Sequence, residues 1–118
     1  MPSSRPRRGE VWFVDLTSGQ GSEICKIRPC VVISADGVGA LPLKVIVPLT
    51  SWQAHFAKNP WMVKIRATST NGLDRNSAAE ALQLRCVDEQ RFDNRKGVLT
   101  ADEMDDVIAA VRLVIDAI

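Results

Sequence analysis

The chain has 118 residues, 46% of them hydrophobic and 25% charged, which is typical of a soluble globular protein and suits one domain over residues 1–118 with a flexible basic arm at residues 1–8. No apolar run approaches the roughly 18 residues of a membrane span or provides the core of a secretory signal, so we expect a cytoplasmic protein without a membrane anchor. The net charge is +1, yet residues 1–98 carry 14 basic against 9 acidic side chains and residues 99–118 carry one against five. A basic body with an acidic end can still present a positive face to phosphate.

The first half of the chain predicts three strands separated by polar segments. Residues 9–16, GEVWFVDL, are rich in β-branched and aromatic side chains, as strands are. A polar, glycine-containing loop leads to Pro29, which opens a second strand, CVVIS, at residues 30–34; its continuous apolar run indicates burial on both faces. After a turn at residues 36–40, the segment LKVIVPLT at residues 43–50 predicts the third strand.

The second half predicts further strands and a terminal helix. Residues 51–60 suit a loop or a short helix, and residues 61–67 alternate as a half-exposed strand does. A turn at Asn71-Gly72 closes that strand, and residues 77–88 carry one longer strand or two short ones.

The last twenty residues hold the clearest local signal. Thr100 and Glu103 have the spacing of a capping box, and four acidic side chains crowd the first turns, where the helix dipole favours them. An apolar stripe follows at helical spacing, formed by Met104, Val107, Ile108, Val111, Ile115 and Ile118. The order of elements predicts a mainly β fold with a C-terminal helix (α+β), arranged as a small twisted β-barrel with the helix packed beside it.

Cysteine and histidine usage points away from metal or disulfide chemistry. Cys25, Cys30 and Cys86 form an odd set without a C-x-x-C pair, and His55 is the only histidine. We therefore expect thiols that are simply packed, no metal site and no cofactor.

Two polar segments at strand ends are the candidate functional residues. The loop GSEICKIRP places Glu23, Lys26 and Arg28 just before a buried strand, and an arginine there can donate two parallel hydrogen bonds to a phosphate. The segment VPLTSWQ ends a strand with the hydroxyls of Thr50 and Ser51, which would contact the same phosphate from the other side. On spacing alone, the simpler explanation is a surface arginine and a threonine that ends the strand and caps the next turn.

The chain resembles the MazF/PemK family of toxin endoribonucleases from bacterial toxin–antitoxin pairs. The resemblance spans nearly the whole chain in the right order, through the segments RGEVWFVDL (8–16), GSEICKIRP (21–29), VVIS (31–34), VPLTS (47–51), ALQLRCVD (81–88) and GVLTADEMDDV (97–107). It implies a MazF/CcdB-like barrel with an SH3-like core, paired as a symmetric homodimer. It also implies cleavage of single-stranded RNA at a preferred sequence, and a cognate antitoxin whose acidic C-terminal segment occupies the RNA groove.

Residue by residue, the resemblance implies that Arg28 and Thr50 are catalytic and that Glu23, Ser51 and Gln83 lie near the RNA. The family often has small residues before the arginine where this chain has Cys25 and Lys26, a departure that affects the preferred RNA sequence.

RNA carries its own nucleophile, the 2′-OH, so cleavage without a metal requires only in-line positioning and charge stabilisation. Arg28 would hold the phosphate and Thr50 would donate to a non-bridging oxygen, leaving a 2′,3′-cyclic or 3′-phosphate and a 5′-OH. The proton acceptor stays open among Arg28 with a lowered pKa, a water and His55.

Three further interpretations remain open at this point. Trp52 could stack an RNA base or simply pack, whereas Trp12 and Trp61 suit the core. The same barrel also occurs in toxins that poison DNA gyrase, which would not need Arg28 and Thr50. A non-catalytic RNA-binding module would keep basic and aromatic surface residues and tolerate loss of Thr50.

Overall fold

Seven strands, three short 3₁₀ helices and one α-helix follow one another in residues 5–117, the part of the chain that this computed structural model describes. The strands are β1 (Glu10–Asp15), β2 (Ile27–Val32), β3 (Leu43–Ser51), β4 (Met62–Ile65), β5 (Ser77–Glu80), β6 (Arg85–Asp88) and β7 (Phe92–Val98). The helices are η1 (Ala54–Lys58), η2 (Ala81–Gln83), η3 (Glu89–Arg91) and α1 (Ala101–Val114). A mainly β fold with a C-terminal helix is thereby confirmed.

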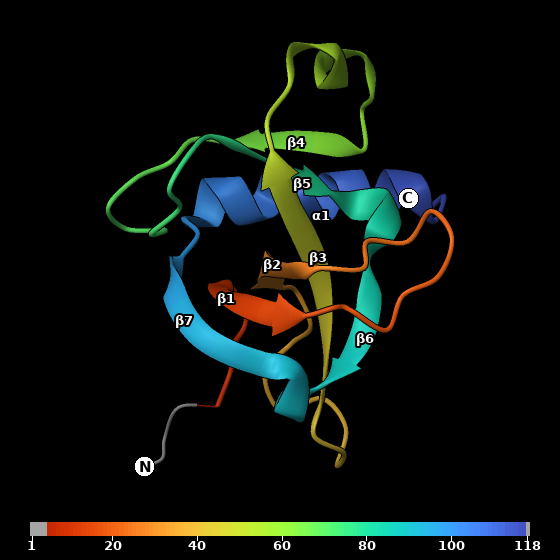
Figure 1. The fold of residues 1–118 in the computed structure, drawn as a ribbon, viewed down its shortest axis with the longest axis vertical. Helices are drawn as coiled ribbons and strands as arrows, with labels where there is room; N and C mark the ends of the chain where they lie inside the picture. The colour runs from red at the N-terminus through yellow and green to blue at the C-terminus, as the bar shows by residue number, and fades with distance from the viewer. Residues whose placement is uncertain (1–4, 118) are drawn as a thin grey trace.

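All strand pairs are antiparallel, in the order β4-β5-β3-β2-β1-β7, with β6 paired to β3 beside this path. The long strand β3 is the centre of the arrangement (Figure 1). Its first part pairs with β6 and β2, and its last three residues pair with β5. The sheet twists strongly around β3, which gives the barrel-like shape predicted from the sequence.

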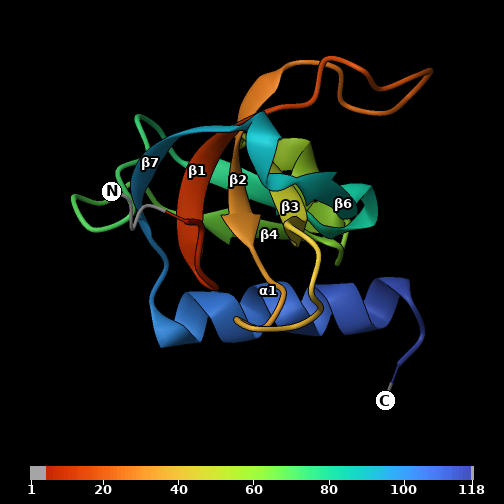
Figure 2. The same cartoon turned by 90° about the horizontal axis from the view of Figure 1, so that it is seen from below.

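The sheet buries apolar side chains on both faces, which explains the continuous apolar run of β2. Val31 belongs to the core cluster that includes Val107 and Val111 of α1, whereas Cys30 and Val32 belong to a second cluster with Trp12. Successive strand residues point to opposite faces, so neighbouring positions of β2 feed the two clusters alternately. Figure 2 shows α1 along one face, while the loop between β1 and β2 projects from the other side.

The capping box predicted for α1 is confirmed. Thr100 Oγ1 accepts from the backbone N–H of Glu103 at 3.1 Å, and a Glu103 carboxylate oxygen accepts from the Thr100 N–H at 2.9 Å. The predicted apolar stripe is buried only through Val111, because Ile115 near the helix end is 59% exposed. Ile118 lies outside the described residues. No helix in the described range is both long and apolar enough to span a membrane.

The structure differs from the sequence prediction at one boundary, the start of β2, and in one additional strand, β7. β2 begins at Ile27 rather than after Pro29, so Arg28 is a strand residue paired with Val14 and not the last residue of a loop. The sequence does not predict β7 at all, because its residues FDNRKGV have no apolar alternation. This strand forms by pairing with β1, and its first residue, Phe92, packs edge-on against Trp12 with ring centroids 5.9 Å apart.

The basic arm expected at residues 1–8 is attached to the sheet from Arg5 onward; residues 1–4 lie outside the described range. Arg5 donates two hydrogen bonds to the Glu89 carboxylate, at 3.1 and 2.9 Å, and Pro6 is buried. The Arg8 backbone N–H donates to Asp36, and its guanidinium donates to a backbone carbonyl. Residues 5–8 thus contact the folded domain at Glu89, Asp36 and Ile33.

Candidate active site

A cleft opens where β2 and β3 separate. Their pairing ends with Cys30 opposite Pro48. Pro48 has no backbone N–H to donate a hydrogen bond to the neighbouring strand. From Leu49 to Ser51, β3 pairs with β5 instead. Continuing the β2–β3 register by two residues places Arg28 opposite Thr50, so the two predicted catalytic residues lie on the two strands that border the cleft.

A cavity of about 330 Å³ occupies this position, and both Arg28 and Thr50 line it. Its other charged lining residues are Arg75, Lys96 and Asp74. Three cations against one carboxylate give the cavity a positive balance, and its volume is within the range of small-ligand sites.

Arg28 is held in a way that leaves part of its guanidinium unpaired. Its Nε is buried and has no hydrogen-bond partner among the described residues. A buried, charged donor without a partner is costly, and such groups in native proteins usually serve a ligand, an ion or a water. The sequence makes Arg28 a candidate phosphate ligand, but it does not predict that the Arg28 Nε is both buried and unpaired.

Glu80 of β5 is the acidic group whose charge Arg28 influences. Burial raises the pKa of Glu80, and the positive charge of Arg28 opposes this by lowering it. Thr50 pairs with Ala78, and residues two apart on a strand share a face, so Glu80 lies on the same face as Thr50. Sequence reasoning missed Glu80, because a glutamate at a strand end has no distinguishing pattern.

The two hydroxyls predicted to act together point to opposite faces of β3. Ser51 follows Thr50 directly and pairs with Ser77, whereas Thr50 pairs with Ala78. Both residues are half-buried and line the same cavity. Thr50 shares its face with Arg28, so it is the hydroxyl better placed to contact the same phosphate.

The loop between β1 and β2 is attached to the rest of the protein through Gln83. The side-chain carbonyl of Gln83 accepts from the Ile24 N–H at 3.2 Å, and its amide donates to the Ser22 carbonyl at 3.0 Å. Gln83 therefore positions this loop. The Glu23 carboxylate accepts from the Gln20 N–H at 2.6 Å, which stabilises the bend of the loop.

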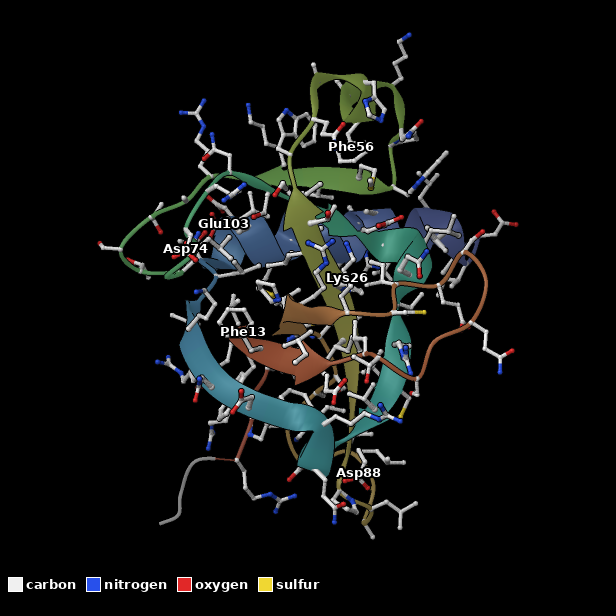
Figure 3. All side chains as sticks on the ribbon, in the orientation of Figure 1. Phe13, Lys26, Phe56, Asp74, Asp88 and Glu103 are labelled. Carbon is white, nitrogen blue, oxygen red and sulfur yellow. The ribbon has the colours of Figure 1, made fainter. Side chains whose placement is uncertain are left out.

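Lys26 has an exposed side chain and lies just before the start of β2 (Figure 3). A second cavity of about 370 Å³ lies between the loop and the segment formed by η2 and the start of β6, with Glu23, Gln83 and Arg85 among its lining residues. Of the predicted RNA-contacting residues, Glu23 and Gln83 thus meet at one cavity, and Ser51 lies at the other.

The segment after β3 projects away from the cleft and carries an aromatic cluster. Trp52 is half-buried and packs edge-on against Phe56 with centroids 5.8 Å apart, and Lys64 Nζ lies 5.4 Å from the Trp52 ring centroid. His55 is exposed, with its ring centroid 4.6 Å from that of Phe56. Figure 3 shows Phe56 in this projecting segment, well away from Phe13 and Lys26. Trp61 packs against the core cluster beside α1.

The three cysteines differ in exposure. Cys25 and Cys86 are exposed and Cys30 is buried, and all three are free thiols. Burial raises the pKa of Cys30 to about 12, with smaller opposing effects from Arg85 and Arg28. Among residues 5–117, no three His, Cys, Asp or Glu side chains gather as a metal site would require.

Sequence reasoning also missed the wall of the cleft that lies toward Asp74 and Phe13 in Figure 3, to which Arg75 and Lys96 also contribute. Asp74 and Arg75 follow a turn motif typical of an ordinary loop, and Lys96 belongs to the strand that the sequence does not predict. No local pattern identifies these residues, since only the tertiary fold brings them to Arg28.

These features define a small twisted β-barrel with one covering helix and a cation-lined cleft at a strand end. The family described as PemK-like, MazF-like toxin of type II toxin-antitoxin system matches residues 7–115. The chain therefore belongs to this toxin family, as its sequence segments suggested.

Two relatives support this assignment, and two solved structures share the fold. The chain is 36% identical to the endoribonuclease MazF9 of Mycobacterium tuberculosis, covering 93% of this chain and 96% of that protein. It is 34% identical to the endoribonuclease EndoA of Bacillus subtilis, covering 91% of each. Its fold is similar to MazF from Deinococcus radiodurans (TM-score 0.79, 22% identity, covering 97% of this chain and 99% of that one). It is also similar to a mycobacterial endoribonuclease in complex with its cognate antitoxin (TM-score 0.72, 20% identity, covering 94% and 95%).

Proposed function

We propose that this toxin-family protein is a sequence-specific endoribonuclease that cuts single-stranded RNA, including mRNA, without a metal ion. The observation that carries the proposal is the buried, unpaired Nε of Arg28 in a cation-lined cleft opposite Thr50. The names of the two relatives, both endoribonucleases, support the same reaction.

In this mechanism, Arg28 binds the scissile phosphate and stabilises the charge that develops on it. Thr50 donates a hydrogen bond to a non-bridging oxygen from the facing strand. The 2′-oxygen of the ribose attacks phosphorus, the bond from phosphorus to the 5′-oxygen breaks, and the two protons involved exchange with solvent in the open cleft. The products are a 2′,3′-cyclic phosphate, or a 3′-phosphate after hydrolysis, and a 5′-OH end.

The remaining predicted residues supply contacts along the RNA. Ser51 lines the cleft and Lys26 is exposed two residues before Arg28, so both would contact the strand near the scissile phosphate. Glu23 and Gln83 line the second cavity, where an unpaired base would be recognised. Trp52 offers a half-buried indole face for stacking farther along the strand.

The test is cleavage of a long unstructured RNA in EDTA by the wild type and by the Arg28→Ala and Thr50→Ala variants. Loss of one positioned charge or donor at a developing oxyanion costs roughly 10²–10³ in rate, so we expect cuts at one short motif with 5′-OH ends, and near-complete loss in both variants. Arg112→Ala and Thr70→Ala remove the same side-chain types at exposed positions that do not line the cavity, and these variants should cut normally. Intact RNA with folded wild-type protein would refute the proposal and make DNA gyrase the next target to test.

Two partners belong to the same proposal. A basic cleft that accepts RNA also suits an acidic, partly disordered antitoxin segment, and a structure with similar fold is an endoribonuclease bound to its cognate antitoxin. A short neighbouring gene for a protein with an acidic C-terminal tail is expected.

We also propose a homodimer, which light scattering would report as about twice 13.0 kDa. Action on cellular RNA would place the protein in the cytoplasm.

A further inference from the structure

We propose that Lys96 forms a second phosphate subsite beside Arg28, with Arg75 assisting and Asp74 limiting its affinity. The ligand is the phosphate of a nucleotide flanking the one that is cut, so this inference rests on the proposed ribonuclease function.

Lys96 is aimed into the cleft by an irregularity in β7. In the pairing of β1 with β7, Val11 lies opposite Gly97 and Trp12 opposite Arg95, so the register skips Lys96. Such a bulge redirects the side chain of the skipped residue. The Lys96 ammonium lies 4.5 Å from the ring centroid of Phe13, and both residues line the cavity that also holds Arg28.

The Lys96 side chain is largely buried, but the carboxylate that pairs with its charge is largely exposed to solvent. The Lys96 side chain is only 13% exposed, and its ion pair is with Asp74 at 3.7 Å, a residue whose side chain is 84% exposed. A carboxylate so fully hydrated contributes little to holding a cation. A largely buried lysine with such a weak partner, next to a second cation that has an unpaired donor, is suited to a divalent or repeating anion such as the RNA backbone.

The opposite wall of the subsite is held rigidly. The loop before β5 packs backbone to backbone on β7, so closely that a Cβ added at Gly72 would overlap the Lys96 carbonyl oxygen. Asn71, fully buried in this loop, bonds to three backbone groups around it. The backbone that leads into Asp74 and Arg75 is therefore anchored beside β7 and Lys96.

The two charges of the Lys96–Asp74 pair should act in opposite directions on RNA. Removing the cation deletes a phosphate contact, whereas removing the carboxylate deletes a repulsion and frees the ammonium. A purely structural ion pair would instead make both substitutions equally harmful to stability and would leave RNA affinity unchanged.

The experiment measures cleavage of an RNA that contains the mapped motif, and binding of its 2′-O-methyl analogue, over a range of salt concentrations. Lys96→Met keeps the aliphatic stem over Phe13 and removes only the charge. We expect its KM and Kd to rise about fivefold near 0.1 M salt, and the slope of log Kd against log salt to fall by about 0.7, with kcat retained. Asp74→Asn should bind RNA more tightly than the wild type. Lys96→Arg keeps the positive charge and should bind RNA with wild-type affinity. Arg112→Met, an equal change of charge on α1, is the control.

If wild-type protein cuts RNA while Lys96→Met keeps the wild-type KM and salt slope, the subsite is refuted and the nuclease assignment stands. An equal shift in Lys96→Met and Arg112→Met would also refute it, since net charge alone would explain the result. If the wild type neither cuts nor binds RNA, the proposed function fails and the subsite fails with it. Melting temperatures establish beforehand that each variant is folded.

Discussion

Replacing Asn71 by alanine tests whether one buried side chain holds the wall of the cleft. The Asn71 side-chain oxygen accepts from the backbone N–H groups of Thr68 and Leu73, each at 3.0 Å, and its amide donates to the Arg66 carbonyl at 2.8 Å. Leu73 is buried, so its N–H would lose its partner without access to water, at a cost of about 1–3 kcal/mol. The other two groups lie at exposed residues and would cost about 0.5–1.5 kcal/mol each. Together the three losses should lower the free energy of unfolding by about 2–6 kcal/mol.

Urea denaturation of the wild type and Asn71→Ala would measure this loss, with an unchanged m-value as the sign that only stability has changed. Asn76→Ala is the matched control, because Asn76 is an exposed residue of the same loop whose side chain accepts a single bond, from the Ala67 N–H at 2.9 Å. It should cost about 1 kcal/mol. If Asn71→Ala cost no more than Asn76→Ala, water would be replacing the lost bonds and the loop would not depend on a buried asparagine.

Three further outcomes are expected. Burial raises the pKa of Glu80, so ionisation of Glu80 lowers the free energy of unfolding. This loss of stability is absent below the pKa of the unfolded state and grows as pH rises through the pKa of the folded state. It should vanish in Glu80→Gln, which urea titrations at several pH values would detect. Thr100→Ala removes half of the capping box and should lower the free energy of unfolding by about 1 kcal/mol; an unchanged urea midpoint would contradict this. Native protein treated with iodoacetamide should be alkylated at Cys25 and Cys86 but not at Cys30, whose buried thiol has a pKa of about 12; mass spectrometry showing a third adduct without denaturant would contradict this burial.

Local sequence signals determined the elements that rely on neighbouring residues. The capping box at Thr100 begins α1 where the sequence predicts it, and the apolar, β-branched segments of β1 and β3 form the expected strands. Burial of β2 on both faces also followed from its unbroken apolar run. Such features depend on period and on backbone groups a few residues apart, which a single sequence displays directly.

The sequence predicts only part of the candidate site. Only the family resemblance points to Arg28 and Thr50, because an arginine before a proline and a threonine at a strand end have ordinary structural explanations. The sequence also suggested that Thr50 and Ser51 act together, whereas strand alternation turns their side chains to opposite faces.

The tertiary structure alone decided how the cleft is built. β7 has no apolar alternation and forms because β1 offers it a partner, and the bulge in that pairing is what brings Lys96 over Phe13. The separation of β2 from β3 after Pro48 and the fixed approach of the Asn71 loop to β7 likewise depend on contacts between distant segments. Pairing between residues far apart in the chain has no local signature, so the sequence by itself established most of the strands and the helix, and their packing established which charges meet at the site.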